Sequence, residues 1–363
     1  MNTKIDLKEL SFQYLCPPGN GVFTVHTAKE NKQKLHQSLY NTDDLNKVTT
    51  KWEESYKSLD TNTKPCLLGV TIDTGGGIQR GANWGPLFIR QQLDFNHFFD
   101  LGDVKTIPHL LHDKYLNTET IKSCREALYS GQPLLPVSAL SITEHFCQNF
   151  YQQYPHKKII GMGGDHSVSY SLVKPWIKAK RSQNKKVAII HFDAHTDLMP
   201  KRLGIDICFA SWAYHMLEEL EAPDDIIQLG IRSSGQDKQH WESKLGVSQY
   251  WANEIIENES QVLKEVIEKL KSKKVDEIYI SFDIDALDAR YASATGTPED
   301  NGLNPETCVK FIQEIGKNFK VTGADLCEVA PFVRSTHSKE GVVEPDETLN
   351  SSRKIMNAFT EVM

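Results

Sequence analysis

The chain of 363 residues carries 41 basic and 48 acidic residues, for a formal net charge of −7, and 39% of its residues are hydrophobic. This acidic balance, without a cluster of lysines and arginines, argues against nucleic acid as a partner. No apolar run approaches the roughly 18 residues of a membrane-spanning helix, and the N-terminus lacks the apolar core of a signal peptide. Seven cysteines without a CxxC pair are typical of a reducing compartment. We therefore expect a cytoplasmic protein whose partner is neither nucleic acid nor a membrane.

Residues 1–63 are polar with scattered aromatic residues, and they contain a helical pattern over 43–60. We expect them to form an N-terminal extension that packs on the main domain. A partly ordered tail is the alternative for this segment. The main domain is expected to cover residues 64–363, because the pattern of apolar residues changes at that point.

From residue 64 onward, apolar strand-like runs alternate with amphipathic segments. The expected strands cover residues 66–72, 157–163, 186–193, 225–231, 276–283 and 319–326, and the expected helices cover 169–180, 261–274 and 305–318. Asn304 before Pro305 indicates the start of the last helix. Strands that are apolar on both faces and separated by helices predict an α/β protein with a mostly parallel sheet in a three-layer α/β/α arrangement. Ligand sites in such sheets lie at the carboxyl ends of the strands.

Acidic residues and histidines follow three of the expected strands: Asp165 and His166; Asp193, His195 and Asp197; and Asp283, Asp285 and Asp288. A single aspartate at a strand end is usually a helix cap or a turn former, and a lone histidine is usually structural. Three such ends together are harder to explain in that way. Clustered, buried carboxylates repel one another unless a cation neutralises them. The pattern therefore predicts a metal site.

Six side chains are the expected metal ligands: His166, Asp193, His195, Asp197, Asp283 and Asp285. They are too many for one tetrahedral zinc ion and suit two divalent ions that share carboxylates. Residues at i, i+2 and i+4 of an extended chain face the same way, so Asp193, His195 and Asp197 are expected to converge along one strand. Oxygen-rich ligation with two histidines favours Mn²⁺, with Ni²⁺, cobalt or iron as alternatives. Such a pair of ions activates water for hydrolysis.

Three motifs in this order, GGDHS (163–167), FDAHTD (192–197) and SFDIDALD (281–288), resemble the signatures of the ureohydrolase superfamily, which comprises arginase, agmatinase and formimidoylglutamase. The resemblance covers roughly residues 65–360, and the segment 69–90 is most similar to the agmatinase branch. It implies an arginase-like α/β/α fold and a metal-dependent hydrolase that acts on C–N bonds of linear amidines. It also implies a binuclear manganese centre and a homo-oligomer, either a trimer or a hexamer.

The resemblance also implies roles for single residues. His166 and His195 would each bind one ion, the four aspartates would complete both, and Asp197 would also hold the attacking hydroxide. GADLCEVAP (323–331) resembles the family's D-x-x-E-V-x-P segment, which would place Glu328 under the substrate guanidinium as a bidentate partner. ATGTPEDNGL (294–303) is expected to supply a backbone turn near the metal loop.

One position departs from the family pattern. The family's catalytic histidine aligns with Phe209 in DICFASWAYHML (206–217), and phenylalanine cannot transfer a proton. Three hypotheses follow: His215 takes the catalytic role, or a substrate with a smaller leaving group needs no such histidine, or the protein is an inactive, metal-binding relative. Trp212, together with Tyr214 and Trp84, is expected to line the substrate pocket.

We therefore expect a binuclear-metal hydrolase of a guanidino C–N bond, in agmatine, a guanidino acid or guanidine, that releases urea and an amine or ammonia. A formimidoylglutamase-like hydrolase that releases formamide is one alternative, and a catalytically weak metal-binding relative is another. A two-metal phosphoesterase is disfavoured, because no basic residue accompanies the motifs to hold a phosphate.

Overall fold

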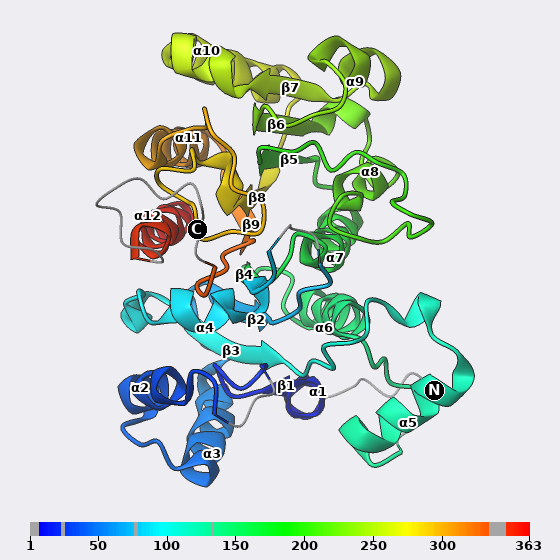
Figure 1. Ribbon diagram of the computed structural model, residues 1–363, viewed down its shortest axis with the longest axis vertical. Helices are drawn as coiled ribbons and strands as arrows, with labels where there is room; N and C mark the ends of the chain where they lie inside the picture. Colours follow the sequence, from blue (N-terminus) through cyan, green and yellow to red (C-terminus); the bar gives the residue numbers. More distant parts are fainter. Residues whose placement is uncertain (1–6, 23–25, 76–78, 132–133, 334–345) are drawn as a thin grey trace.

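The computed structural model describes residues 7–22, 26–75, 79–131, 134–333 and 346–363. Within these ranges the centre of the molecule is a nine-stranded sheet with the order β1-β3-β2-β4-β9-β8-β5-β6-β7 (Figure 1). All neighbouring strands are parallel except β1 and β3. The strands are β1 (Leu15–Cys16), β2 (Cys66–Val70), β3 (Phe99–Val104), β4 (Ile159–Gly163), β5 (Val187–Phe192), β6 (Ile226–Ile231), β7 (Ser248–Trp251), β8 (Glu277–Asp283) and β9 (Lys320–Cys327).

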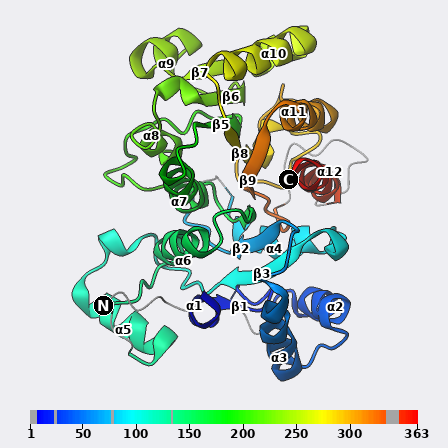
Figure 2. The same cartoon turned by 180° about the vertical axis from the view of Figure 1, so that it is seen from behind.

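Helices cover both faces of this sheet (Figures 1 and 2). One face carries α1 (Leu7–Tyr14), α6 (Ala139–Gln153), α7 (Val168–Ser182) and α8 (Trp212–Met216), with α5 (Thr118–Tyr129) and α9 (Lys238–Leu245) at the two ends of this layer. The other face carries α4 (Gly85–Arg90), α10 (Ala252–Ser272), α11 (Pro305–Asn318) and α12 (Asp346–Val362), and α2 (Lys29–Tyr40) and α3 (Leu45–Ser55) extend this layer. The three-layer α/β/α fold predicted from the sequence is therefore confirmed.

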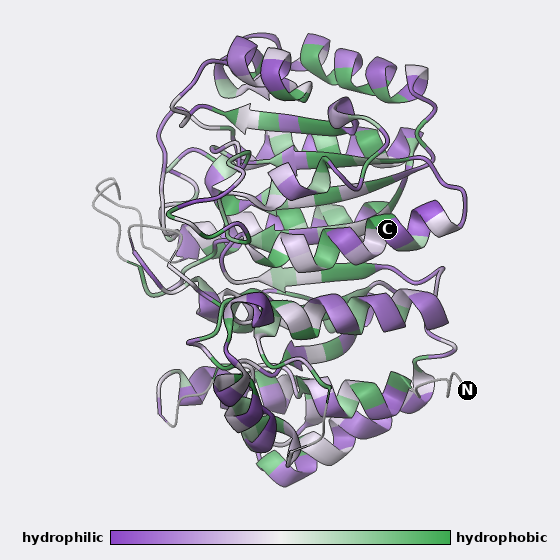
Figure 3. Cartoon of the chain, turned by 90° about the vertical axis from the view of Figure 1, so that its right-hand side faces the viewer, coloured by the Kyte–Doolittle hydropathy of each residue, from purple (hydrophilic) through white to green (hydrophobic). Residues whose placement is uncertain are grey.

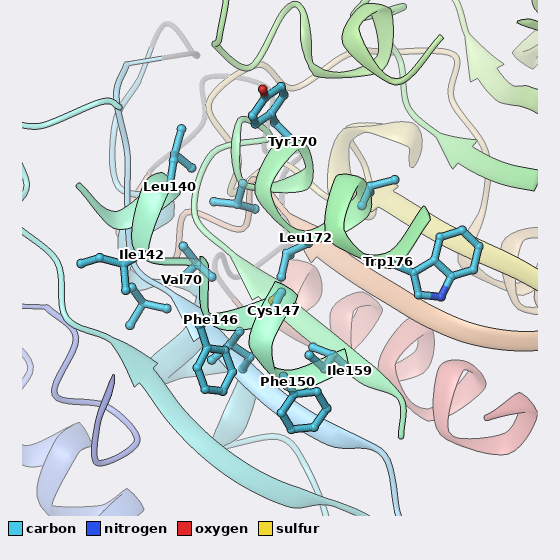
Figure 4. Packing of buried hydrophobic residues seen from close by; sticks show 14 of the residues in the cluster. Val70, Leu140, Ile142, Phe146, Cys147, Phe150, Ile159, Tyr170, Leu172 and Trp176 are labelled. Atoms are coloured by element: carbon cyan, nitrogen blue, oxygen red, sulfur yellow. The ribbon is translucent and has the colours of Figure 1, made fainter. Parts of the chain in front are cut away.

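Two apolar cores lie on the two sides of the sheet. On one side, Phe146 and Phe150 of α6 and Leu172 and Trp176 of α7 face the strands, and these side chains are buried (Figure 4). Figure 3 shows hydrophobic residues along the strands and hydrophilic residues on the outer surfaces of the helices. Burial of apolar surface on both faces stabilises the sheet and gives the strand ends a rigid position.

All six expected strands are present, with boundaries that differ by a few residues. The expected N-cap is confirmed, since the backbone N–H of Thr307 donates to Oδ1 of Asn304 over 2.7 Å. Three strands were not expected from the sequence: β1, β3 and β7. In β3 the polar residues Asp100 and Asp103 and the intervening Gly102 interrupt the apolar pattern, and β7 is only four residues long.

The first described residues join the sheet and its helices. Strand β1 pairs antiparallel with β3, and α1 packs on α6. The Oδ2 atom of Asp103 accepts hydrogen bonds from the backbone N–H groups of Gly19 (2.8 Å) and Gly21 (3.1 Å), while its Oδ1 faces the buried guanidinium of Arg90. This buried ion pair fixes residues 15–21 against the edge of the sheet. The expected helix at 43–60 is observed as α3 followed by a short 3-10 turn, Tyr56–Ser58. Among the described residues, no helix is both long and apolar enough to cross a bilayer.

Candidate metal centre and active site

Four adjacent central strands, β4, β9, β8 and β5, end at the same edge of the sheet. His166 lies just beyond β4, Glu328 directly follows β9, Asp283 is the last residue of β8, and Asp193 directly follows β5. Parallel strands bring their carboxyl ends together. The residues predicted from three separate motifs therefore meet in one place.

The imidazole of His166 is surrounded by three carboxylates. Its Nδ1 lies 3.1 Å from Oδ2 of Asp193, 3.2 Å from Oδ2 of Asp197 and 3.2 Å from Oδ2 of Asp283. All four residues are buried, yet this Nδ1 has no hydrogen-bond partner among the described residues. A buried, unpartnered nitrogen amid carboxylate oxygens is the arrangement expected of a metal ligand.

The tautomer of His166 follows from its second nitrogen. The hydroxyl of Ser281 donates to Oδ1 of Asp325 over 2.8 Å, so its oxygen accepts a hydrogen from Nε2 of His166 at 3.0 Å. In the neutral imidazole Nε2 therefore carries the proton and Nδ1 keeps its lone pair, as metal ligation requires.

A second imidazole faces the same group of carboxylates. Nδ1 of His195 lies 3.1 Å from Oδ2 of Asp285 and 3.4 Å from Oδ1 of Asp193. The two carboxylate oxygens of Asp193 thus face different imidazoles, Oδ1 toward His195 and Oδ2 toward His166. Asp193 therefore faces both imidazoles, and its carboxylate would be available to an ion held at either of them.

The donor set fits two divalent cations. Its four aspartates are buried, and within the described part of the chain their ion pairs are with histidine alone. Burial, together with the negative charges of Asp285 and Asp193, raises the pKa of Asp283 well above its ordinary value. Four buried carboxylates without cations nearby would lower the free energy of unfolding. When all four are ionised, bound cations are therefore needed to balance their charge.

A chain of buried amides orients Asp193 from behind. Nε2 of Gln228 donates to Nδ1 of His191 over 2.9 Å, so the imidazole donates from Nε2 to Oδ2 of Asp193, also over 2.9 Å. Oε1 of Gln228 in turn accepts from Gln249 over 2.8 Å. The network crosses β5, β6 and β7 and fixes both the tautomer of His191 and the angle of the Asp193 carboxylate.

Trp212 supports the neighbouring carboxylate. Its indole Nε1 donates to Oδ2 of Asp197 over 2.9 Å, and the whole side chain is buried. The ring also packs against the imidazoles of His166 and His191, with centroids 5.0 and 4.8 Å apart. The structure thus gives Trp212 a contact to Asp197 in place of the substrate contact expected from the sequence.

The three ligand-type residues after β5 converge for a different reason from the one predicted. Strand β5 ends at Phe192, so Asp193, His195 and Asp197 lie in an irregular segment with a bend at residues 194–195 rather than in a continuing strand. Asp197 has φ of 50° and Glu328 has φ of 64°, both in the left-handed region. Such backbone is uncommon outside glycine and is stabilised here by the surrounding turns.

The GGDHS turn itself depends on close packing. A Cβ at Gly164 would overlap with the carbonyl oxygen of Ile72, so only glycine fits. Asp165, one residue on, is not a metal donor. It accepts from both the backbone N–H (2.5 Å) and the hydroxyl (2.6 Å) of Thr74, and it thereby ties the loop after β2 to the turn that carries His166.

The segment 294–303 contributes side chains, not only a backbone turn. The hydroxyl of Thr297 donates to Oδ2 of Asp285 over 2.9 Å, and Oε1 of Glu299 lies 3.4 Å from Nε2 of His195. Arg232 joins this segment to the metal loop, because its guanidinium donates to the carbonyl oxygens of Asp285 (2.8 Å) and Glu299 (2.9 Å). The contacts of Thr297 and Glu299 were not predicted from the sequence, although the motif that contains both residues was.

A cavity of about 620 Å³ opens over this site. The predicted residues that line it are His166, His195, Asp197, Asp283 and Glu328. Phe209, which aligns with the family's catalytic histidine, also lines it, together with Arg202 and Trp241. The last two residues were not expected from the sequence: Arg202 lies between two of the motifs without belonging to either, and Trp241 is distant from all of them along the chain.

Glu328 lies within the floor of this cavity. Its Oε1 accepts the backbone N–H of His166 over 2.9 Å, and its own N–H donates to the carbonyl oxygen of Gly164 over 2.8 Å. Burial, followed by the charges of Asp283 and Asp165, raises its pKa well above the ordinary glutamate value. A cationic ligand in the cavity would relieve this electrostatic cost.

Four other predicted residues lie elsewhere. His215 is not among the described residues that line the cavity, and its Nε2 donates to the carbonyl oxygen of Asp206 over 2.6 Å. A proton shuttle at His215 is therefore not supported by its position. Trp212, Tyr214 and Trp84 are also absent from the described lining, and Trp84 instead packs against Phe332, with ring centroids 5.3 Å apart.

A family model described as the arginase family matches residues 63–344. The chain belongs to the arginase family. It is therefore a metal-dependent hydrolase that acts on C–N bonds, from a family that uses a binuclear metal centre. The cluster of histidines and aspartates described above lies where such a centre would form.

Similar proteins include several ureohydrolases. Agmatinase of Bacillus subtilis (strain 168) is 33% identical over 307 residues, which cover 80% of this chain and 88% of that protein. Mitochondrial guanidino acid hydrolase of Homo sapiens is 29% identical over 73% of this chain and 71% of that protein. The crystal structure of formimidoylglutamase from Bacillus subtilis subsp. subtilis str. 168 superposes with a TM-score of 0.64, at 21% identity, over 83% of this chain and 87% of that one. This last likeness establishes a shared fold.

Proposed function

We propose that this arginase-family protein hydrolyses a guanidino C–N bond and releases urea together with an amine or ammonia. The observation that carries the proposal is the position of Glu328. This buried carboxylate lines the cavity that contains the metal donors, and no lysine or arginine of the described residues pairs with it. A planar guanidinium offers two parallel N–H donors to such a carboxylate.

Glu328 selects both the charge and the orientation of the substrate. A guanidinium replaces the missing positive charge beside a carboxylate whose pKa is raised by burial. Bidentate pairing fixes the plane of the guanidinium, so its central carbon is presented to the metal donors in one orientation. The hydrogen bond from the backbone of His166 holds the carboxylate in place.

The metal ligands proposed are His166, Asp193, His195, Asp197, Asp283 and Asp285. When bound, two divalent ions at these residues supply the positive charge that makes water nucleophilic near neutral pH. Mn²⁺ is the ion we propose, because four carboxylates and two imidazoles favour a hard divalent cation, with Ni²⁺ as the alternative.

Asp197 is the residue proposed to handle protons. The attacking water forms a C–O bond to the guanidinium carbon and loses two protons, the C–N bond breaks, and the leaving nitrogen gains both protons, so that the products are urea and an ammonium ion. The two histidines among the described residues that line the cavity, His166 and His195, are both proposed metal ligands. Phe209 cannot supply a proton. The carboxylate of Asp197, held by the indole of Trp212, is placed to accept a proton from water and return it to the leaving amine.

The assay that tests this function measures urea, ammonia and formamide released by protein loaded with Mn²⁺ or Ni²⁺. The substrates are agmatine, arginine, 4-guanidinobutyrate, free guanidine and formiminoglutamate. We expect urea from at least one guanidino compound. Release of formamide from formiminoglutamate, without urea from any other compound, would assign the formimidoylglutamase reaction instead, and no turnover at all would contradict the proposal.

Two substitutions test the assigned roles. Glu328→Gln keeps the shape of the side chain and removes its charge, so we expect KM to rise and kcat/KM to fall at least a hundredfold. Asp197→Asn should abolish turnover. Glu277→Gln is the matched control, since Glu277 is a buried glutamate at the start of β8, at the opposite end of the strand from Asp283. Equal losses in Glu328→Gln and Glu277→Gln would indicate a general folding defect.

We also infer that the protein works in the cytoplasm as a homo-oligomer, either a trimer or a hexamer. These expectations rest on the family and on the composition of the chain. Light scattering coupled to size-exclusion chromatography measures the oligomer directly, and a monomer would contradict this inference.

A further inference from the structure

The cavity has a rim whose charge differs from that of its floor. The floor carries the carboxylates of Asp197, Asp283 and Glu328. Apart from these residues and the two histidines, Arg202 is the one charged side chain among the described residues that line the cavity. Around it the wall is neutral, with Met199, Phe209, Ser234, Gln236 and Trp241.

Arg202 is both positioned and available. Its guanidinium lies over the ring of Phe209, 5.2 Å from the ring centroid, in a cation–π arrangement. Its backbone is fixed by two hydrogen bonds with Ile205, of 2.7 and 2.9 Å. Within the described part of the chain no carboxylate forms an ion pair with Arg202, and the residue is exposed. It therefore offers planar donors to a ligand without first having to break an internal pair.

Phe209, whose ring lies under the guanidinium of Arg202, is also the residue that departs from the family pattern. Phe209 replaces the histidine of the resemblance and lines the same cavity as Arg202. A flat apolar ring gives the guanidinium a surface to stack on, whereas a protonated histidine would repel it. The phenylalanine at position 209 thus gives Arg202 a stacking surface inside the cavity.

We propose that Arg202 binds the carboxylate of the substrate, so that the substrate class is a guanidino acid rather than a guanidino amine or free guanidine. This inference rests on the proposed guanidino hydrolysis and narrows it. One end of the ligand is a cation held by Glu328, and the other is an anion held by Arg202. A volume of about 620 Å³ is within the usual range for a ligand pocket and far exceeds what guanidine alone would fill.

The first experiment compares two substrates of similar length and opposite charge at the far end. We expect kcat/KM for 4-guanidinobutyrate to exceed that for agmatine at least tenfold at low ionic strength, with the ratio falling as salt screens the rim. Guanidinoacetate and 3-guanidinopropionate then measure the preferred spacing. A preference for agmatine or for free guanidine over all three acids would overturn the proposal.

Substitution of Arg202 tests its role directly. Arg202→Gln should lower the ratio of kcat/KM for 4-guanidinobutyrate to that for agmatine about three- to tenfold, which is the scale of a partly exposed ion pair. Arg202→Glu should lower the ratio further and reverse the preference. Lys201→Gln is the matched control, because Lys201 is exposed on the same loop and is absent from the described lining. A ratio that is the same in wild type and Arg202→Glu would overturn the assignment.

A binding measurement separates this inference from the proposed function. Calorimetric titration with 4-aminobutyrate and with putrescine, the expected amine products of the acid and of agmatine, requires no turnover. We expect 4-aminobutyrate to bind wild type more tightly than Arg202→Gln, and putrescine to show the opposite order. If this pattern holds while no guanidino compound is hydrolysed, the proposed reaction fails and the anion site at Arg202 remains. If urea is released but 4-aminobutyrate binds both proteins equally, the anion site fails and the reaction remains.

Discussion

The indole N–H of Trp212 donates a 2.9 Å hydrogen bond to Oδ2 of Asp197. The same oxygen lies 3.2 Å from Nδ1 of His166, so the indole fixes one carboxylate oxygen at the centre of the metal donors. Trp212 begins α8 and is fully buried. The helix packing on one face of the sheet therefore determines the orientation of a side chain that we assign to the chemistry.

Trp212→Phe keeps an aromatic ring and removes this donor. We expect kcat to fall about tenfold or more, with little change in KM, because hydrogen bonds behind a metal ligand typically contribute 10- to 100-fold. Steady-state kinetics on protein of known metal content measure the effect. Trp176→Phe is the control, since Trp176 is another buried tryptophan, and its indole donates to Thr322 far from the metal donors. Similar losses in both variants would show that core packing, rather than the bond to Asp197, is responsible.

The amide chain behind Asp193 should affect metal affinity. Gln228→Met preserves the length of the side chain but removes the donor that fixes the tautomer of His191. We expect metal affinity to fall about tenfold and the free energy of unfolding to fall by about 1–3 kcal/mol, because buried polar groups are left unpaired. Metal titration calorimetry and denaturant melts measure the two effects. Gln249→Met removes the hydrogen bond from Gln249 to Gln228 and leaves the bond from Gln228 to His191 in place. If Gln249→Met lowered metal affinity as much as Gln228→Met, the effect would not be due to the tautomer of His191.

Removal of the metal ions should reverse the effect of one substitution on stability. In metal-free protein, burial and the neighbouring carboxylates raise the pKa of Asp283, so folding at neutral pH must either protonate this carboxyl or bury its charge. Asp283→Asn removes that cost, so we expect it to raise the free energy of unfolding by about 1–2 kcal/mol. In metal-loaded protein the same change removes a ligand and should lower the melting temperature. Thermal melts with and without chelator measure both. Asp288→Asn is the control, because Asp288 accepts hydrogen bonds from Arg290 and Gly302, and its loss should destabilise both forms. Destabilisation of metal-free protein by Asp283→Asn would contradict the repulsion argument.

Phe209→His restores a titratable group to the cavity wall. We expect kcat to rise several-fold below about pH 6.5, where an ordinary imidazole is protonated and can donate to the leaving amine. The gain should disappear as the pH rises through the imidazole pKa, so the kcat profile acquires an ionisation near pH 6.5. Phe209→Asn is a polar control without that ionisation. An identical pH dependence in the two variants would show that position 209 lies out of reach of the leaving group.

Much of the fold and the grouping of the candidate metal donors were predictable because their signals are local. The runs at 66–72, 157–163, 186–193, 225–231, 276–283 and 319–326 are apolar on both faces, so they indicate buried parallel strands. Chemistry at the carboxyl ends of such strands then follows from the topology. His166, Asp193 and Asp283 could be assigned together in this way before their distances were known.

The remaining features depend on contacts between distant residues. The side chain of Arg202 reaches the ring of Phe209 through a tight loop that no local pattern predicts. Trp212 and His215 lie on the same short helix, but one turns toward Asp197 and the other toward the carbonyl of Asp206. Sequence alone does not fix the rotation of a five-residue helix, so neither of these contacts could be predicted.

Asp197 and Glu328, the two carboxylates assigned to proton transfer and substrate binding, are also held in left-handed backbone. Such conformations typically cost about 1–3 kcal/mol each at residues other than glycine. Glycine at either position would relieve the backbone strain, but it would also remove a buried hydrogen bond, from Trp212 to Asp197 or from the backbone of His166 to Glu328. The same side-chain contacts that orient these carboxylates for the reaction therefore also offset the cost of the backbone that carries them.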